Sequence, residues 1–189
     1  MLYFVGRLVE KKGARVLIEA LERLRDSGGQ FLCRIVGEGP QTEDMRQHVE
    51  KASLDDCVEL LGSQPQERVK ALFDEADVFV LPCVVAADGD RDGIPVALME
   101  AMALGVPVVS TTVSGIPELI QSERDGILTE PGDAQALADA LGTLIDDPQR
   151  TGELAAAARA RIEADFDIDQ SADRLLAKIR EAVAAREKA

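Results

Sequence analysis

Short runs of apolar residues alternate along the chain with longer segments whose apolar positions recur at helical spacing. The first run, Leu2 to Val5, is followed by Leu17, Leu21 and Leu24 at intervals of three and four residues, the spacing of one helix face. The runs with strand character cover residues 2–5, 31–36, 58–61, 78–81, 106–109 and 126–128. Strands that alternate with helices in this way predict an α/β fold, with a mainly parallel sheet of about six strands covered by helices on both faces.

The segments between the strands have the periodicity and end signals of helices. They predict helices over residues 13–27, 41–52, 66–74, 95–104 and 114–120. After the sixth strand the chain is helical, over residues 133–145, 149–165 and 168–187. This last part is rich in alanine but has no sustained heptad pattern, so a coiled coil is not indicated. We expect one domain over residues 1–189, with the helices of 149–187 packing on its surface.

Composition narrows the classes of partner. The 189 residues carry 21 Lys and Arg against 35 Asp and Glu, a net charge of −14, which disfavours general binding to nucleic acid or to an anionic membrane. No apolar run approaches the ~20 residues of a membrane-spanning helix, and the first residues lack a signal-peptide pattern. Cys33, Cys57 and Cys83 fit neither a disulfide framework nor a zinc site, so reduced thiols and a cytoplasmic location are expected. With His48 as the only histidine, a histidine-based triad or metal site is disfavoured.

Ligands of parallel α/β sheets bind beyond the carboxyl ends of the strands. The loops at that edge cover residues 6–13, 37–40, 82–94 and 110–116. In the first of them, Gly6 and Arg7 end a strand, and Lys12 and Gly13 open a helix. A guanidinium, an ammonium and a helix N-terminus at one place favour a phosphate. The alternative is a pair of solvated cations, and the sequence separates Lys12 only weakly from Lys11.

The loop after the second strand reads Val36-Gly37-Glu38-Gly39-Pro40. Gly37 and Gly39 would let the backbone approach a ligand closely. The pair does not extend to the third glycine of a nicotinamide or flavin fingerprint, and no Gly-Lys-Ser/Thr motif of a triphosphate loop occurs in the sequence. The alternative is a tight turn between a strand and a helix.

The segment from Asp92 to Met102 is the most informative. Glu100 lies in an otherwise apolar predicted helix, where a carboxylate is costly unless it is hydrogen-bonded or paired. The two hydroxyls of a ribose would satisfy it, at a depth of about 7 Å along the helix from its start. Gly93 and Ile94 offer backbone N–H groups just before Pro95, the expected first residue of the helix. The alternative for Glu100 is an ion pair with an arginine in the core.

Two further features have simpler alternatives. Ser114 and Gly115 precede a second helix and form a potential anion nest, although Ser114 as a plain N-cap is the favoured interpretation. Asp88, Asp90 and Asp92 alternate in one loop, where an acidic, solvated loop is a better interpretation than an ion site.

Taken together, these loops resemble the donor-binding domain of the retaining glycosyltransferases of family 4, the group 1 class with the GT-B fold. The resemblance covers the chain from Phe4 to about Ala182. The motifs are Gly6-Arg7 with Lys12-Gly13, the turn 36–40, the acid pair Asp92 and Glu100, and the tracts 100–109 and 114–118. It implies the Rossmann-like C-terminal half of a GT-B enzyme, and residues 90–120 resemble members that build surface polysaccharides.

The resemblance also implies roles for single residues. Arg7 and Lys12 would bind the donor diphosphate and stabilise it as it leaves, and Asp92 would contact the transferred sugar. These three are the expected catalytic residues. The base would be flanked by the turn 37–40 and by main chain near Val58 to Leu60. The residues expected to bind the donor are Gly6, Gly37, Gly39, Val58, Leu60, Gly93, Ile94, Pro95, Glu100, Ser114 and Gly115.

The chain departs from the family pattern in two respects. Asp92 stands where the family usually has glutamate, which shortens its reach by ~1.5 Å. The sequence also begins at the first strand of the second half of the fold, so we expect the N-terminal acceptor domain to be missing and the isolated chain to be inactive. The resemblance implies a nucleotide-diphosphate sugar as donor substrate, and neither a cofactor nor a metal. The alternatives are a non-catalytic nucleotide-binding module and a GT-B-like sugar-nucleotide epimerase or phosphorylase.

Overall fold

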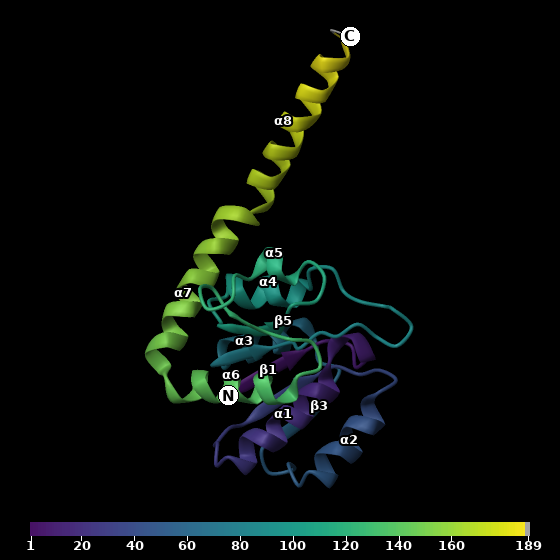
Figure 1. The fold of residues 1–189 in the computed structure, drawn as a ribbon, viewed down its shortest axis with the longest axis vertical. Helices are drawn as coiled ribbons and strands as arrows, with labels where there is room; N and C mark the ends of the chain where they lie inside the picture. Colours follow the sequence, from purple (N-terminus) through teal and green to yellow (C-terminus); the bar gives the residue numbers. More distant parts are fainter. Residues whose placement is uncertain (188–189) are drawn as a thin grey trace.

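A parallel sheet forms the centre of the domain (Figure 1). The computed structural model describes residues 1–187, and within them the sheet has six strands in the order β3-β2-β1-β4-β5-β6. The strands are β1 (Leu2–Val5), β2 (Cys33–Val36), β3 (Val58–Gly62), β4 (Val78–Val80), β5 (Val108–Thr111) and β6 (Ile127–Thr129). The fold class predicted from the sequence is confirmed. The direction of strand addition reverses between β1 and β4, the position at which open α/β sheets bind their ligands.

Helices cover both faces of this sheet. They are α1 (Ala14–Asp26), α2 (Thr42–Lys51), α3 (Gln66–Asp74), α4 (Val96–Ala103), α5 (Ile116–Leu119), α6 (Ala134–Asp146), α7 (Pro148–Asp165) and α8 (Ile168–Glu187), and a 3-10 turn, η1 (Glu10–Lys12), precedes α1. Right-handed crossovers place α1 and α2 on one face and α4 and α5 on the other. α6 returns to pack against α1, and α7 packs against α4.

The central strand β1 is packed on both faces, as a parallel strand requires. Leu2, Tyr3 and Phe4 are at most 1% exposed. The ring of Tyr3 meets Phe73 of α3 edge-on, with 4.9 Å between the centroids. The Tyr3 hydroxyl donates to the carbonyl of Val69 at 3.5 Å. These contacts fix α3 against the strand that ends at Gly6.

Two differences from the predicted elements occur at prolines. The strand expected over 106–109 runs over Val108–Thr111 instead, because Pro107 has no N–H for the ladder, although its carbonyl accepts from the N–H of Phe79 at 2.9 Å. Pro95 is not the first helical residue. It is the N-cap of α4, with φ −65° and ψ 128°, since this extended conformation turns the chain into the helix.

The helix α7 is anchored to the domain. Its Leu154 and Ala158 are buried, and the Nε of Arg161 donates to the carbonyl of Leu119 at 2.7 Å. The same guanidinium lies 3.7 Å from the carboxylate of Asp125, which is only 2% exposed. Asp125 Oδ1 also accepts from the N–H of Gln121 at 2.6 Å. Burial raises the pKa of Asp125 above its usual range, against the opposing effects of these two partners.

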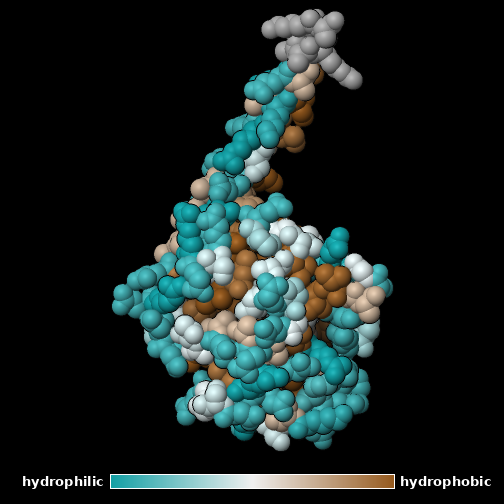
Figure 2. All heavy atoms as spheres, viewed as in Figure 1, coloured by the Kyte–Doolittle hydropathy of each residue, from teal (hydrophilic) through white to brown (hydrophobic). Residues whose placement is uncertain are grey.

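The helix α8 does not pack on the domain, which corrects the expectation for residues 168–187. It continues beyond α7 and points away from the sheet (Figure 1), and its described side chains are exposed. Large apolar side chains lie along it at helical spacing, visible as a brown stripe in Figure 2, and these are Ile168, Leu175, Leu176, Ile179 and Val183. None of the helices in residues 1–187 is long and apolar enough to cross a membrane.

Gly13 joins the start of α1 to the end of β4, and this contact predicts a specific loss of stability. A Cβ at Gly13 would lie 1.8 Å from the carbonyl oxygen of Pro82, and its φ is +70°. Gly28 has a similar φ of +91° but nothing within 4 Å. We expect Gly28→Ala to lower the free energy of unfolding by about 1 kcal/mol through φ alone, and Gly13→Ala by about 2 kcal/mol more through overlap. Urea unfolding of both variants measures this, and equal losses would contradict the contact.

The buried carboxylate of Asp125 predicts a pH-dependent stability difference. Its folded pKa is raised by burial, so the folded chain holds this proton more tightly than the unfolded chain. Stability from this site is therefore present below the unfolded pKa and is lost as pH rises through the folded pKa. We expect the unfolding free energy of the natural chain, relative to Asp125→Asn, to fall between pH 4 and 7. Urea unfolding at several pH values tests this, with Asp74→Asn at an exposed site as control, and a rising difference would refute it.

Candidate functional site

The loops after β1 and β2 are joined along their backbones. The N–H of Gly6 donates to the carbonyl of Val36 at 3.0 Å. A Cβ on Gly37 would lie 1.9 Å from the oxygen of Gly6, and one on Gly39 would lie 2.3 Å from the oxygen of Leu8. Both glycines are therefore required by packing between the two loops. This is the tight-turn alternative, and it shapes the carboxyl edge of the sheet without itself identifying a ligand.

The turn η1 directs Lys12 to the edge between β1 and β4. Gly13, in the left-handed region at φ 70°, lets the chain pass directly over Pro82 at the end of β4. The aliphatic stem of Lys12 lies against Gly6, with its Cδ 3.7 Å from the position a Cβ would take there. The ammonium group is thereby held at the point where strand order reverses.

An ion pair connects this lysine to the loop before α4. Lys12 Nζ lies 2.7 Å from Asp92 Oδ2, and Lys11 Nζ lies 3.4 Å from Asp92 Oδ1. The Asp92 side chain is 16% exposed. Two residues that the sequence assigned to the site, Lys12 and Asp92, are thus in direct contact.

The acidic loop is exposed to solvent at Asp88 and Asp90, as the sequence favoured, and its carboxylates also have partners within the chain. Asp88 accepts from the N–H of Asp90 at 2.9 Å, while Asp90 lies 3.0 Å from Lys11 Nζ. Over residues 1–187, no group of three or more His, Cys, Asp or Glu side chains is placed to hold a metal ion. The acidic side chains of this loop are engaged by a backbone amide and by lysines.

The thiol group of Cys83 contacts the carboxylate of Asp92. Its Sγ lies 3.8 Å from Asp92 Oδ2. Burial raises the pKa of Cys83 to about 12, so the group is a neutral thiol at pH 7 and donates to the carboxylate. Cys33 is buried and Cys57 half-buried, and all three thiols are free in the described chain.

Arg7 is the exposed cation of the loop after β1. It follows Gly6 directly and is exposed. Within the part of the chain that the structure describes, its guanidinium forms no ion pair, whereas Lys11 and Lys12 are both paired. An anion arriving at the edge therefore meets one uncompensated guanidinium and two lysines already neutralised by carboxylates.

The N-terminal ends of α4 and α5 lie side by side. A Cβ on Gly115 would be 3.0 Å from Ile94 Cγ1 and 3.7 Å from the carbonyl carbon of Gly93. At Gly93, by contrast, an added Cβ would meet nothing within 4 Å. Packing explains Gly115, whereas Gly93 leaves the backbone before α4 open. Backbone N–H groups at such a helix start attract anions.

Ser114 does not cap α5, so the favoured interpretation of this residue is wrong. The N-cap is Gly115, and no side chain caps the helix. Ser114 has φ 51°, a left-handed conformation, and it is exposed. The hydroxyl remains available beside the mouth of α4.

Glu100 is exposed, which corrects the expectation of a carboxylate buried in an apolar helix. The helix α4 packs through Leu98, Ala101 and Met102, so position 100 faces away from the sheet. It lines a groove of about 290 Å³ between α3 and α4 whose other residues are Gln66, Val69, Lys70, Phe73, Ala103 and Leu104. Among the described residues Glu100 has no ion-pair partner, so the alternative of a core ion pair is also wrong.

The residues expected to flank a base meet at a second hollow. Gly37 and Leu60 both line a space of about 220 Å³ at the carboxyl ends of β2 and β3, while Val58 is buried in β3. Sequence reasoning missed the polar lining of this hollow, namely Glu38, Thr42 and Arg46. Thr42 and Arg46 lie four residues apart on α2, and that spacing, which places side chains on one helix face, was the available signal.

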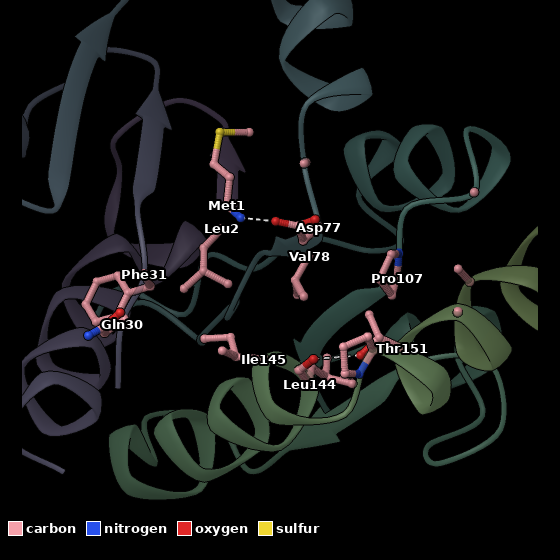
Figure 3. A pocket seen from close by; sticks show the side chains of 15 residues that line it. Met1, Leu2, Gln30, Phe31, Asp77, Val78, Pro107, Leu144, Ile145 and Thr151 are labelled. Atoms are coloured by element: carbon pink, nitrogen blue, oxygen red, sulfur yellow. Dashed lines mark hydrogen bonds and ion pairs between the residues drawn. The ribbon is translucent and has the colours of Figure 1, made fainter. Parts of the chain in front are cut away.

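A larger hollow of about 560 Å³ lies at the opposite edge of the sheet, at the amino ends of the strands (Figure 3). Leu2, Val78 and Pro107 line it beside Leu144 and Ile145 of α6. Its carboxylate, Asp77, is paired with the amino group of Met1. This edge lies away from the switch-point loops, and none of the expected site residues lines it.

Comparisons with known proteins identify the family of this chain. The sequence profile of the family "Glycosyl transferases group 1" matches residues 1–161. The chain is 47% identical over 180 residues to "Putative colanic acid biosynthesis glycosyltransferase WcaL" of Escherichia coli, covering 95% of this chain and 44% of that protein. It is 48% identical to "Amylovoran biosynthesis glycosyltransferase AmsK" of Erwinia amylovora over the same shares. The chain therefore spans less than half the length of these relatives.

Solved structures place the fold. The crystal structure of Anabaena HepE in complex with UDP and glucose matches with a TM-score of 0.82 and 26% identity, over 95% of this chain and 47% of that one. The C-terminal domain of a group 1 glycosyltransferase (LpcC) from Francisella tularensis matches with a TM-score of 0.77 and 23% identity, over 88% of this chain and 86% of that domain. The fold is that of the C-terminal domain of GT-B glycosyltransferases, and the chain belongs to the group 1 glycosyltransferase family.

Proposed function

We propose that this chain is the donor-binding domain of a retaining glycosyltransferase. The full enzyme would transfer a sugar from a nucleotide-diphosphate sugar to an acceptor in polysaccharide or glycoconjugate biosynthesis. The proposal is supported by the exposed Arg7 in the loop after β1, by Lys12 in contact with Asp92 before α4, and by the open backbone at Gly93. HepE, at a TM-score of 0.82, is described with UDP and glucose, and the relatives WcaL and AmsK are named for polysaccharide biosynthesis.

The diphosphate is the part of the donor that this edge fits best. Arg7 is exposed without an ion pair in the described chain, and Lys12 lies beside the mouth of α4. Two cations and a helix start lower the energy of a group whose negative charge grows as the sugar leaves. Removing one such electrostatic contact typically raises a barrier by about 3 kcal/mol.

The other expected site residues would contact the remaining parts of the donor. Asp92, beside Lys12, would contact the sugar, and Glu100, whose carboxylate is exposed on α4, would accept hydrogen bonds from the ribose hydroxyls. Gly37 and Leu60 line the hollow proposed for the base. Ser114 and Gly115 lie next to the phosphate-facing backbone.

Retention would proceed by attack on the same face from which the leaving group departs. The bond from the anomeric carbon to the diphosphate oxygen breaks as the acceptor oxygen bonds to that carbon. The acceptor proton passes to the departing diphosphate, so no carboxylate pair for a double displacement is needed. Arg7 and Lys12 supply the charge stabilisation, and we propose that neither metal nor cofactor takes part. The acceptor would be held by an N-terminal domain, in a cytoplasmic enzyme whose membrane contact, if any, is peripheral.

Titration of this chain with UDP, GDP and ADP by calorimetry tests the proposal. We expect saturable binding of one diphosphate, weakened at least about tenfold by Arg7→Ala and by Glu100→Ala, since each removes a hydrogen bond that involves a charged group. Arg15→Ala and Glu50→Ala remove exposed charges on α1 and α2 and serve as matched controls. If no diphosphate binds at millimolar concentration, or if the controls weaken binding equally, the assignment is wrong.

The proposal also predicts that the chain alone transfers no sugar. The reaction needs an acceptor site, and this chain spans 44% of the relative WcaL. Incubation with each nucleotide sugar and a panel of acceptors, followed by mass spectrometry, should show no glycosylated product above a no-protein control. Sustained turnover by the purified chain would contradict the requirement for a second domain.

A further inference from the structure

Lys11 and Lys12 are neighbours in sequence, but their ammonium groups have different partners. Lys12 Nζ lies 2.7 Å from Asp92 Oδ2. Lys11 Nζ lies between two carboxylates, 3.0 Å from Asp90 Oδ2 and 3.4 Å from Asp92 Oδ1. Each oxygen of Asp92 therefore faces one lysine. The hydrogen bond with Asp90, followed by the charges of Asp92 and Asp90, raises the pKa of Lys11 against partial desolvation, so Lys11 remains charged at neutral pH.

The backbone around Lys11 also holds the loop that carries these carboxylates. The carbonyl of Lys11 accepts from the N–H of Val84 at 3.0 Å, and Glu10 Oε1 accepts from the N–H of Ala87 at 3.2 Å. The N–H of Ala86 donates to the carbonyl of Asp90 at 2.9 Å, which closes the loop on itself. Lys11 thus contacts the loop near its beginning through the main chain and near its end through the side chain.

The four charges of this cluster balance. Two lysines face two aspartates, and the Asp92 side chain is only 16% exposed. When Lys12 turns toward an incoming diphosphate, Asp92 loses its nearer cation and lies beside a new anion. Like charges at such distances repel strongly when solvent screening is reduced. Lys11 is the group positioned to keep Asp92 neutralised at that moment.

We propose that Lys11 is a positioning residue for Asp92, which holds this carboxylate in place and compensates its charge while Lys12 binds the donor diphosphate. The inference rests on the proposed function, because it needs a diphosphate at Lys12. It assigns Lys11 a role different from that of Lys12, which the sequence separated only weakly. It also explains how an aspartate, one methylene shorter than glutamate, is held at a defined place in this loop.

A direct role in phosphate binding is the competing explanation for Lys11. In that case the effect of removing Lys11 would not depend on residue 92. If Lys11 acts through Asp92, its removal harms diphosphate binding only while residue 92 carries a charge. A double-mutant cycle separates the two explanations, because coupling between contacting groups appears as non-additivity.

The cycle uses calorimetric titration with the diphosphate that binds best among UDP, GDP and ADP. Lys11→Met should weaken binding about tenfold in the natural chain and less than about twofold in the Asp92→Asn background. Lys11→Arg, which keeps the charge, should restore binding. Lys51→Met, at the exposed end of α2, is the control for the loss of one positive charge. Urea unfolding of each variant shows whether the fold is intact, and a loss of stability without the coupling would mean a structural role alone.

Each result decides the inference. Equal weakening in both backgrounds would show that Lys11 contacts the ligand directly, and unchanged binding in Lys11→Met would show that it has no role; either overturns the inference. If Lys11→Arg binds as weakly as Lys11→Met, charge compensation is wrong. These failures leave diphosphate binding by the natural chain intact. If the natural chain binds no diphosphate, the proposed function fails, and this inference fails with it.

Discussion

The ion pair between Lys12 and Asp92 is the contact on which the arrangement of this edge depends. It joins the turn after β1 to the loop after β4, two segments that meet only because strand order reverses between these strands. The side chains of Lys12 and Asp92 are 18% and 16% exposed. Each charge is therefore compensated by the other when no ligand is present. The pair also fixes the loop that leads into α4, and with it the open backbone at Gly93.

Backbone contacts make this edge stiff. Gly13 passes over Pro82, Gly37 over Gly6, and Gly39 over Leu8, each at a distance that leaves no room for a Cβ. The backbone that carries the cations therefore has a set position before any ligand binds, which reduces the conformational entropy lost on binding. The chain has a net charge of −14, yet this small region presents three cations. Its own carboxylates neutralise two of them, so affinity for an anion depends on how readily Lys12 exchanges its contact with Asp92 for one with the ligand.

The sequence allowed the sheet and the loops that share its carboxyl edge to be predicted, because both follow from local patterns and one topological rule. Apolar runs mark the strands, and the loops after parallel strands must share an edge. The side-chain pairings were not predictable, since Lys11 and Asp90 are distant in sequence and no periodicity links them. Glu100 was misjudged for a different reason: the apolar character of α4 as a whole hid the inward face marked by Leu98, Ala101 and Met102. The packing of α8 was also misjudged, because the sequence pattern of an apolar stripe is the same whether the stripe packs on the domain or is exposed to solvent.

That bare stripe has a practical consequence for anyone who purifies the domain. A helix of twenty residues extends about 30 Å, and α8 presents Ile168, Leu175 and Val183 to water over much of that length. The helix is thus an exposed apolar surface on a domain with a high net negative charge. The solubility of the domain depends on the balance between charge repulsion and the apolar helix. At low ionic strength, repulsion between the negative domains keeps the molecules apart. At high salt, this repulsion is screened and the exposed apolar helices associate.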